Sequence, residues 1–401
     1  MTKLPTGLQL TPFDPDYLED PYPVIKRLRE ADPLHYDEEL RRYFPTRYDD
    51  VRRILKDSRY LTDPHSSLPD SFARHFLIEE GQEVSMLMAD EPRHLRLRRL
   101  VNDLFKPRAV LNWRPRIESV VEFYLDRIEG PEFDLIKDFA DPVPTVVIAE
   151  IMGIPGEMQQ EFKHWSTLTQ EAAFSPAPSE QALADAAEGM EKLEAFFLSE
   201  IERRRAEPGD DLITQLVAAE IEGDRLTDKE IIDQCVLLLL AGNLTTGDMI
   251  GNGIRALLEN PSQLEKLRQQ PQLIEATVEE ILRYDSPVLN SGRITHEDTE
   301  YKGCPIRKGE CLHVSLAGAN RDPEVYENPD SFDIERPLIA HLAFGGGRHF
   351  CLGAHLARLE GQVAILGLVQ RFPELGLSER GHAQGLVPEF RGMEYCWLKT
   401  G

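Results

Sequence analysis

Cysteine is scarce in this chain, and no two cysteines stand at a close spacing. The 401 residues include five, without any Cys-x-x-Cys pair: Cys235, Cys304, Cys311, Cys351 and Cys396. An odd number of scattered cysteines does not form a disulfide framework, and a structural zinc site needs ligands paired at short spacing. The sequence therefore favours a reducing compartment, and we expect a cytoplasmic protein.

Long apolar runs are missing as well. The longest, CVLLLLA at 235–241, is far shorter than the roughly 20 residues that a membrane-spanning helix needs. The N-terminal stretch MTKLPTGLQLTPFDPDYLEDPYP is rich in proline and acidic residues and has no apolar core, so we do not expect a signal peptide. The sequence predicts no membrane anchor.

Positive charge is in short supply. Lysine and arginine together number 45 against 70 aspartate and glutamate residues, which gives a formal net charge of −25. This balance disfavours nucleic acid or an anionic membrane as the main partner. The sequence also lacks internal repeats and Gly/Ser/Pro linkers, and FSPAPSEQA at 174–182 is expected to be a loop. We therefore expect one domain over residues 1–401, and a monomer.

Helical patterns dominate what is present. Apolar residues recur at helical spacing in VIKRLREADP, DVRRILKD and SVVEFYLDRIEG, and through a long block at 180–206. Strand patterns are short: RYFPTRYDD predicts one strand, and RITHEDTEY followed by CPIRKGECLHVSL predicts a hairpin that turns at Lys302 and Gly303. The expected fold is mainly α with small β regions.

Residues 343–358, AFGGGRHFCLGAHLAR, place one cysteine between a glycine turn and a helix. The apolar residues from Leu352 onward follow a helical period, so Cys351 should lie at a helix N-terminus. There, unpaired amides and the helix dipole favour a thiolate and lower the pKa of the thiol. The glycines at 345–347 allow positive φ and close approach to a flat ligand. Three interpretations stay open: a packed structural cysteine, a nucleophile, or a ligand to iron.

A second feature is one very long helix. Thr227 and Glu230 form a capping box at its start, and the helix is expected to run to Asn260 and Pro261. In its middle, AGNLTT at 241–246 is poor helix material, because threonine hydroxyls can bond the carbonyl one turn back. The segment is compatible with a kinked core helix or with a groove that holds a small diatomic ligand.

Two charged motifs complete the set. Glu280 and Arg283, at i and i+3, can pair on one helix face, and Arg336 downstream can convert the pair into a buried triad. In DEPRHLRLRRLV at 90–101, His94 and Arg98 share a helix face. That face either is solvated or points inward, where it needs a buried anion.

Together these features resemble the cytochrome P450 family of haem-thiolate monooxygenases, over nearly the whole chain and in the family's order. The family's haem-binding signature, F-G-x-G-x-H-x-C-x-G, is matched at Phe344, Gly345, Gly347, His349, Cys351 and Gly353. The resemblance implies the P450 fold, with haem b between the long distal helix and the Cys351-bearing helix, and Cys351 as the iron ligand. The cysteine lacks the histidine pattern of a thiol hydrolase, which disfavours a nucleophile.

The family pattern also assigns the charged motifs. Glu280, Arg283 and Arg336 match a structural triad rather than catalytic groups. Contacts to the haem propionates are implied for His94, Arg98, Arg293 and His349. These propionates are the anions that the inward face at 94 and 98 requires.

The catalytic segment departs from the family at one position. The family expects an acid before the pair Thr245 and Thr246, and this chain has Leu244 there. Thr245 aligns with the threonine that helps to protonate dioxygen, and general acid assistance is typically worth about 10²–10⁴ in rate. Three alternatives stay open: Asn243 or Asp248 with ordered water replaces the acid, the substrate supplies a polar group, or hydrogen peroxide is the oxidant.

The resemblance implies oxygen insertion from O2 into a small hydrophobic substrate, with electrons from NAD(P)H through ferredoxin reductase and ferredoxin. A basic patch is expected to dock the ferredoxin, formed by Arg96, Arg99, Lys106 and Arg348. The expected substrate pocket is lined by Met86, Leu87, Leu237, Leu240, Ala241, Leu244, Val288, Leu289 and Asn290. The alternatives are a peroxide-driven peroxygenase or a non-oxidative haem-thiolate enzyme, and a non-catalytic haem sensor, and Leu244 favours all of them.

Overall fold

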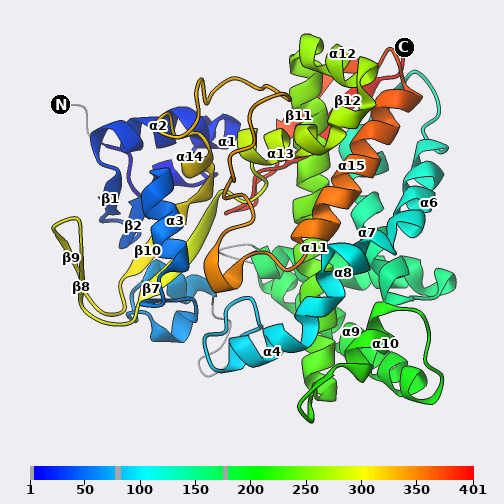
Figure 1. The fold of residues 1–401 in the computed structure, drawn as a ribbon, viewed down its shortest axis with the longest axis horizontal. Coiled ribbons are helices and arrows are strands. Elements are labelled where there is room, and N and C mark those ends of the chain that lie inside the picture. Colours follow the sequence, from blue (N-terminus) through cyan, green and yellow to red (C-terminus); the bar gives the residue numbers. More distant parts are fainter. Residues whose placement is uncertain (1–3, 77–82, 175–178) are drawn as a thin grey trace.

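The computed structural model describes residues 4–76, 83–174 and 179–401, and Figure 1 shows their arrangement. The helices are α1 (Pro15–Glu19), α2 (Pro21–Ala31), α3 (Tyr48–Lys56), α4 (Arg93–Asn102), α5 (Pro107–Leu111), α6 (Arg114–Leu125), α7 (Pro142–Met152), α8 (Gln159–Phe174), α9 (Glu180–Ala206), α10 (Leu212–Ala218), α11 (Asp228–Glu259), α12 (Pro261–Gln269), α13 (Ile274–Tyr284), α14 (Leu316–Asn320) and α15 (Ala354–Arg371). The strands are β1 (Leu34–Asp37), β2 (Arg42–Pro45), β3 (Tyr60–Leu61), β4 (Glu132–Asp134), β5 (Glu220–Ile221), β6 (Asp224–Arg225), β7 (Asn290–Thr295), β8 (Thr299–Tyr301), β9 (Cys304–Ile306), β10 (Cys311–Ser315), β11 (Gly376–Gln384) and β12 (Met393–Lys399). The fold is mainly α with small sheets, as the sequence predicts.

The largest sheet lies to one side of the helices, next to α1, α2, α3 and α14 (Figure 1). Its strand order is β1-β2-β10-β7-β3, and only the β2–β10 pair is parallel. The predicted early strand is β2, and the predicted hairpin is β8–β9. Lys302 and Gly303 turn that hairpin with φ values of 51° and 83°. Both strand predictions are confirmed.

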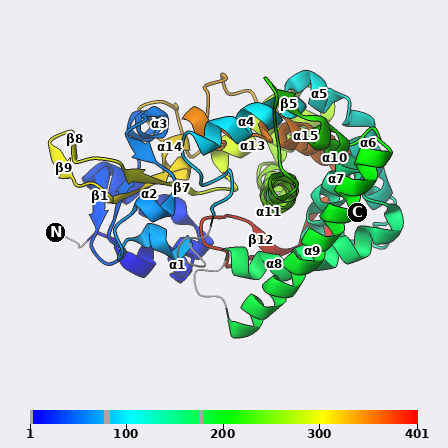
Figure 2. The same ribbon diagram turned by 90° about the horizontal axis from the view of Figure 1, so that it is seen from below.

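Helix α11 runs through the middle of the helical part and is seen end-on in Figure 2. Its capping box forms as predicted: the Glu230 amide donates to Thr227 Oγ1 at 3.2 Å, and the Thr227 amide donates to Glu230 Oε2 at 2.9 Å. The helix ends at Glu259, directly before Asn260 and Pro261. The whole segment 241–246 is helical, so the threonines do not interrupt the helix.

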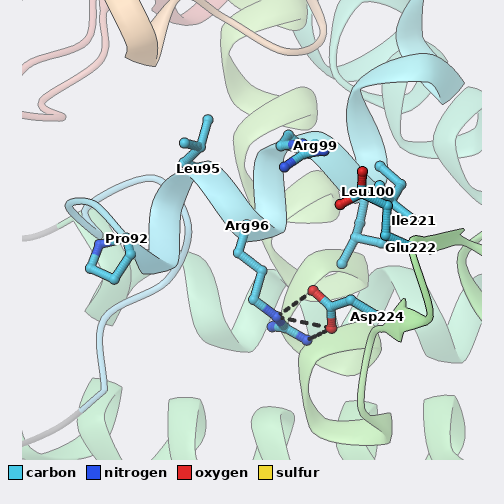
Figure 3. A pocket seen from close by; sticks show the side chains of 8 residues that line it. All are labelled: Pro92, Leu95, Arg96, Arg99, Leu100, Ile221, Glu222 and Asp224. Carbon is cyan, nitrogen blue, oxygen red and sulfur yellow. Dashed lines mark hydrogen bonds and ion pairs between the residues drawn. The ribbon is translucent and has the colours of Figure 1, made fainter.

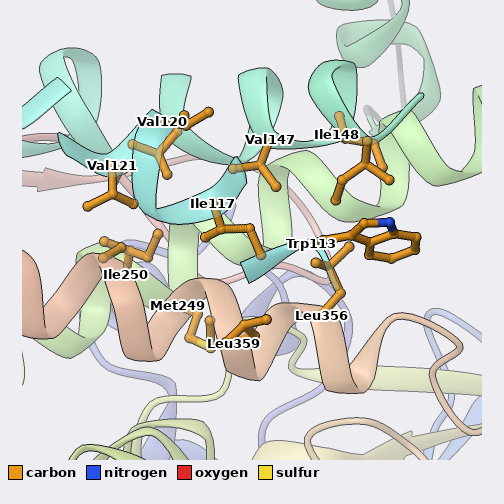
Figure 4. Packing of buried hydrophobic residues seen from close by; sticks show 14 of the residues in the cluster. Trp113, Ile117, Val120, Val121, Val147, Ile148, Met249, Ile250, Leu356 and Leu359 are labelled. Carbon is orange, nitrogen blue, oxygen red and sulfur yellow. The ribbon is translucent and has the colours of Figure 1, made fainter. Parts of the chain in front are cut away.

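The main hydrophobic core packs α11 against α7 and α15, and it packs α6 against the same two helices (Figure 4). Met249 and Ile250 of α11 meet Ile117 of α6 and Leu359 of α15 in this cluster. Helices approach closely at Gly253, where an added Cβ would lie 2.7 Å from Ile281 Cδ1 of α13. This packing fixes α11 and α15, the two helices that border the candidate site.

The other helix predictions are also confirmed. The patterns at the start of the chain and around residues 50–57 and 119–130 correspond to α2, α3 and α6, and the block at 180–206 is α9 with the same bounds. Part of the predicted loop at 174–182 lies outside the described residues. Within the described ranges, every helix is too short or too polar to cross a membrane.

Candidate active site

The glycine turn before α15 is fixed by hydrogen bonds and by the end of α3. Gly345 and Gly347 both have φ of +68°, a conformation that favours glycine. A Cβ at Gly347 would also clash with the carbonyl oxygen of Leu55 in α3. The turn closes where the Cys351 amide donates to the Phe344 carbonyl at 3.0 Å. The sequence therefore needs glycine at 347 both for the backbone conformation and for the contact with α3.

Cys351 lies three residues before the first residue of α15, with Gly353 as the N-cap. Burial raises the pKa of the Cys351 thiol, while the Gly353 amide and the charges of Arg98 and Arg358 oppose this. The predicted lowering of the pKa by the helix terminus is therefore wrong for the polypeptide alone, because desolvation outweighs the nearby dipoles. A coordinated metal ion would reverse this order, since a ligating thiol is deprotonated outright.

Two imidazoles, one buried and one partly buried, lie against each other beside this turn. The ring centroids of His94, on α4, and His349 are 4.1 Å apart. Among the described residues, His94 Nδ1 and His349 Nε2 have no hydrogen-bond partner. Burial lowers the pKa of both rings, that of His349 to about 2, and nearby cationic groups act in the same direction. Both rings are therefore neutral and present unused polar atoms.

Two arginines border the same region. Arg293, in β7, is almost fully buried, and burial lowers its pKa to about 10. Its Nη1 donates to Ser291 Oγ at 3.0 Å and to the Gly292 carbonyl at 2.7 Å. Arg98 Nη2 donates to the Phe350 carbonyl at 2.8 Å. In the described part of the chain, neither guanidinium forms an ion pair with a carboxylate.

These residues fit the propionate end of a haem. A buried guanidinium without a carboxylate partner is costly, and it requires an anion from outside the polypeptide. The unpaired imidazole nitrogens add donors or acceptors for the same group. The thiol, the glycine turn and this cationic cluster therefore make a donor set that suits an iron porphyrin with two carboxylates.

The middle of α11 borders open space. Most of its C-terminal half is buried, but the predicted pocket residues Leu237, Leu240, Ala241 and Leu244 are partly or fully exposed, as is Thr245. They follow the spacing of one helix face. Thr245 Oγ1 donates to the Ala241 carbonyl at 2.8 Å, so its hydroxyl lies on this face.

Two predicted catalytic residues lie elsewhere. Asn243 is 7% exposed, and its Oδ1 accepts from Thr145 Oγ1 of α7 at 2.6 Å. The prediction that Asn243 assists Thr245 is wrong, because the Asn243 side chain points to the opposite side of α11. Thr246 is 2% exposed and is packed inside the protein, away from the open face.

Several predicted pocket residues belong to the core or the surface. Met86 is buried in the main core cluster, and Leu289 is buried in a separate cluster with Leu10 and Tyr17, so their place in the pocket stays a prediction. The remaining three residues are Leu87, 52% exposed; Val288, which forms a backbone bridge with Phe390; and Asn290, whose Nδ2 donates to Glu389 Oε2 at 3.1 Å. The polar group of Asn290 is thus partly used within the protein.

The three charged residues of the predicted triad meet as expected. Arg283 donates to both carboxylate oxygens of Glu280, at 2.7 and 2.8 Å. Arg336 Nε lies 3.2 Å from each of the same oxygens. The Asp333 amide adds a hydrogen bond of 2.9 Å to Glu280 Oε1. Glu280 and Arg283 are buried and Arg336 is partly buried, which fits a structural role.

One residue near the cysteine was missed. Arg358 of α15 stacks on the Phe344 ring, with its guanidinium carbon 4.6 Å from the ring centroid, and donates to Glu279 Oε2 at 3.0 Å. It follows Cys351 by seven residues, so helical spacing could have placed it on the cysteine side of α15. Its charge is one of those that stabilise an anion at Cys351.

The expected basic patch is largely neutralised. A surface pocket of about 350 Å³ lies between α4 and the β5–β6 hairpin (Figure 3). At its edge Arg96 pairs with Asp224 at 2.9 Å and with Glu230 at 2.5 Å. Two more members are paired as well, Lys106 with Asp103 and Arg348 with Glu91. Within the described residues, Arg99 is the one member that is exposed and forms no ion pair.

Fold and site together define a helical protein with one cysteine ligand position opposite a long central helix. A family model described as Cytochrome P450 matches residues 43–378. The polyketide biosynthesis cytochrome P450 PksS of Bacillus subtilis is 39% identical over 391 residues, which cover 92% of this chain and 93% of the relative. The biotin biosynthesis cytochrome P450 of the same species is 38% identical, with 91% and 92% covered.

Solved structures agree with these relatives. P450BioI, in complex with an acyl carrier protein ligated to hexadec-9Z-enoic acid, has a TM-score of 0.87 and 36% identity, covering 96% of this chain and 99% of its own. The chain belongs to the cytochrome P450 family, whose members are oxidoreductases that carry haem.

Proposed function

We propose that this protein is a monooxygenase that inserts one oxygen atom from O2 into a small hydrophobic molecule, using electrons from NAD(P)H delivered by ferredoxin reductase and ferredoxin. The observation that carries the proposal is the buried Arg293 guanidinium, which forms no ion pair with a carboxylate of the described residues, together with the unpaired nitrogens of His94 and His349. The exposed apolar stripe of α11 supports a hydrophobic substrate. The cytoplasm would supply these electron donors.

In this proposal the residues around Cys351 hold the haem. Cys351 would ligate the iron, and the propionates would be held by His94, Arg98, Arg293 and His349. When bound, the haem-thiolate group supplies the redox chemistry that activates dioxygen. Thr245 keeps a hydroxyl on the open face of α11 and would pass a proton to the reacting oxygen. Leu237, Leu240 and Ala241 would exclude water around it.

A ligand screen tests the binding part of this proposal. The relatives' names refer to polyketide and biotin biosynthesis, and one solved relative holds a C16 acyl chain on a carrier protein. We expect free and carrier-bound hexadec-9Z-enoic acid to shift the haem absorption band of the haem-loaded protein, followed by a hydroxylated product. A screen of fatty acids, polyketide fragments and steroids with no spectral shift and no product would contradict the proposal.

A peroxide-driven reaction is the second candidate, and Leu244 favours it. Without an acid beside Thr245, proton delivery from solvent is weaker, and hydrogen peroxide brings its own protons. Leu244→Glu is expected to raise the ratio of product formed to NAD(P)H consumed, because it restores a carboxyl next to Thr245. The measurement compares reductant-driven and peroxide-driven turnover in both proteins. If peroxide alone supports full turnover and Leu244→Glu changes nothing, the peroxygenase is the better description.

The ferredoxin docking surface is proposed to depend on Arg99. Arg99→Glu is expected to slow reduction by ferredoxin at low salt and to flatten its salt dependence, because an exposed, unpaired charge steers association. Stopped-flow reduction at several salt concentrations measures this. Lys308→Glu is the matched control, since Lys308 is exposed in the turn between β9 and β10 and is not part of the predicted patch. Equal effects of the two reversals would contradict the docking proposal.

A further inference from the structure

Asp248 carries a buried carboxyl that forms no ion pair with any other described residue. It is 7% exposed, and its Oδ2 has no hydrogen-bond partner in the described part of the chain. Burial raises its pKa well above the ordinary value, and the charges of Asp141 and Asp285 act in the same direction. An unpaired carboxylate would be very costly in this position. Asp248 is therefore a neutral, protonated carboxyl.

A negative charge on Asp248 would not be paired with a cation. Arg255 and Arg391 are both engaged by Asp285, at 3.1 and 2.7 Å, and no cation of the described residues forms an ion pair with Asp248. On the other side, the junction before α7 approaches α11 closely at Gly247. A side chain at residue 392, directly before β12, would clash with the carboxyl of Asp248. The glycine at 392 thus leaves a space that the Asp248 carboxyl fills.

Asp248 lies on the same face of α11 as Thr245, the residue proposed to pass a proton to oxygen. Ala241, Thr245, Asp248 and Asn252 stand at i, i+4, i+7 and i+11 of α11. Asn252 donates through Nδ2 to the Arg391 carbonyl at 2.8 Å, while its Oδ1 has no partner among the described residues. Two unpaired buried oxygens therefore follow Thr245 along one face, and such oxygens commonly bond ordered water.

We propose that Asp248 supplies the proton that the family takes from the acid at position 244, and that it does so from the next turn of the helix through Thr245. This inference rests on the proposed monooxygenase function. Leu244 leaves no carboxyl before Thr245, and Asn243 points to the opposite side of the helix. Asp248 is the carboxyl that follows Thr245 on its own face.

The proton transfers balance without any other bond change. The carboxyl of Asp248 gives its proton to a water molecule, which passes one proton to the Thr245 hydroxyl. That hydroxyl passes its own proton to the reduced oxygen in the pocket. The Asp248 carboxylate then regains a proton from solvent, and the electrons come from the proposed ferredoxin system. Because the carboxylate is disfavoured by burial, its reprotonation is strongly driven.

The test is Asp248→Asn in the haem-loaded protein. The variant keeps the size of the side chain and removes its proton. We expect product per NAD(P)H consumed to fall about tenfold or more, with the electrons lost to hydrogen peroxide. Turnover driven by added hydrogen peroxide should stay near that of the parent, because this oxidant carries its own protons. Introducing Leu244→Glu into Asp248→Asn should restore much of the coupling, and by a larger factor than in the parent.

Two further measurements keep the proposal falsifiable. Infrared spectra should show the carbonyl stretch of a protonated carboxyl that shifts in D2O and is lost in Asp248→Asn. Glu360→Gln is the matched control, because Glu360 is also buried with an unpaired oxygen but belongs to α15. The proposal is overturned if the infrared band is absent, if Asp248→Asn stays coupled, or if only Glu360→Gln uncouples. Product from neither reductant nor peroxide in the parent would instead refute the proposed function.

Discussion

Cys351→Ser is expected to remove the enzymatic activity of this protein, by at least about a hundredfold, while the fold persists. Loss of partners that merely orient metal ligands already costs about 10- to 100-fold, and Cys351 is proposed as the ligand itself. The reduced carbonyl complex should lose the absorption band that is typical of thiolate-ligated haem. Turnover and the carbonyl difference spectrum, measured on the same preparation, check this result.

Cys304→Ser is the matched control for this experiment. Cys304 is partly exposed in β9, far from α15, and its Sγ lies 4.0 Å from Tyr43 Oη and 3.9 Å from the Pro305 carbonyl oxygen. This variant should keep both the spectrum and the activity. A Cys351→Ser protein with an unchanged carbonyl spectrum would show that another group ligates the iron, and the proposed site would be wrong.

The sequence predicted most of the fold because local signals and global packing agree. The capping box of α11 and its Asn260-Pro261 end define both helix termini from neighbouring residues alone. The β8–β9 hairpin follows from two residues with positive φ at its turn. The triad was predictable because Glu280 and Arg283 share a helix turn and Arg336 completes a known motif.

The direction of single side chains was harder to predict. Spacing tells which residues share a helix face, but it does not tell what that face meets. Asn243 follows Ala241 by two residues, so it points away from the open face, and only α7 supplies the hydroxyl that binds it. Met86 belongs to a segment without periodicity, so its burial depends on tertiary contacts. Likewise, the charge of Arg96 is paired by Asp224, which lies on a hairpin that is distant in the sequence.

The pKa of the Cys351 thiol was also hard to predict from the sequence. The position of Cys351 before α15 was predicted, but its pKa was not, because local dipoles compete with desolvation by the whole fold. The environment of Arg293, His94 and His349 could not be predicted from the sequence either. Each residue is polar in sequence, and only the structure shows that, among the described residues, Arg293 forms no ion pair and the two imidazoles keep unpaired nitrogens.

Glu280→Ala is expected to lower the free energy of unfolding by about 3–5 kcal/mol, because it leaves Arg283 and Arg336 buried without their carboxylate. Arg283 is 2% exposed, so water cannot replace the lost partner. Urea unfolding followed by circular dichroism measures the change, and haem should dissociate more readily because α13 packs on α15.

Glu275→Ala provides the control on the same helix, since Glu275 is exposed in the first turn of α13 and its loss should cost less than about 0.5 kcal/mol. Combining Glu280→Ala with Arg336→Leu should recover part of the stability, because one of the two uncompensated charges is then removed as well. If Glu280→Ala is as stable as Glu275→Ala, the triad does not stabilise the fold. In that case the buried arginines must be satisfied by their carbonyl partners, among which the Asn320, Pro329 and Ser331 oxygens lie 2.8–3.1 Å from Arg283.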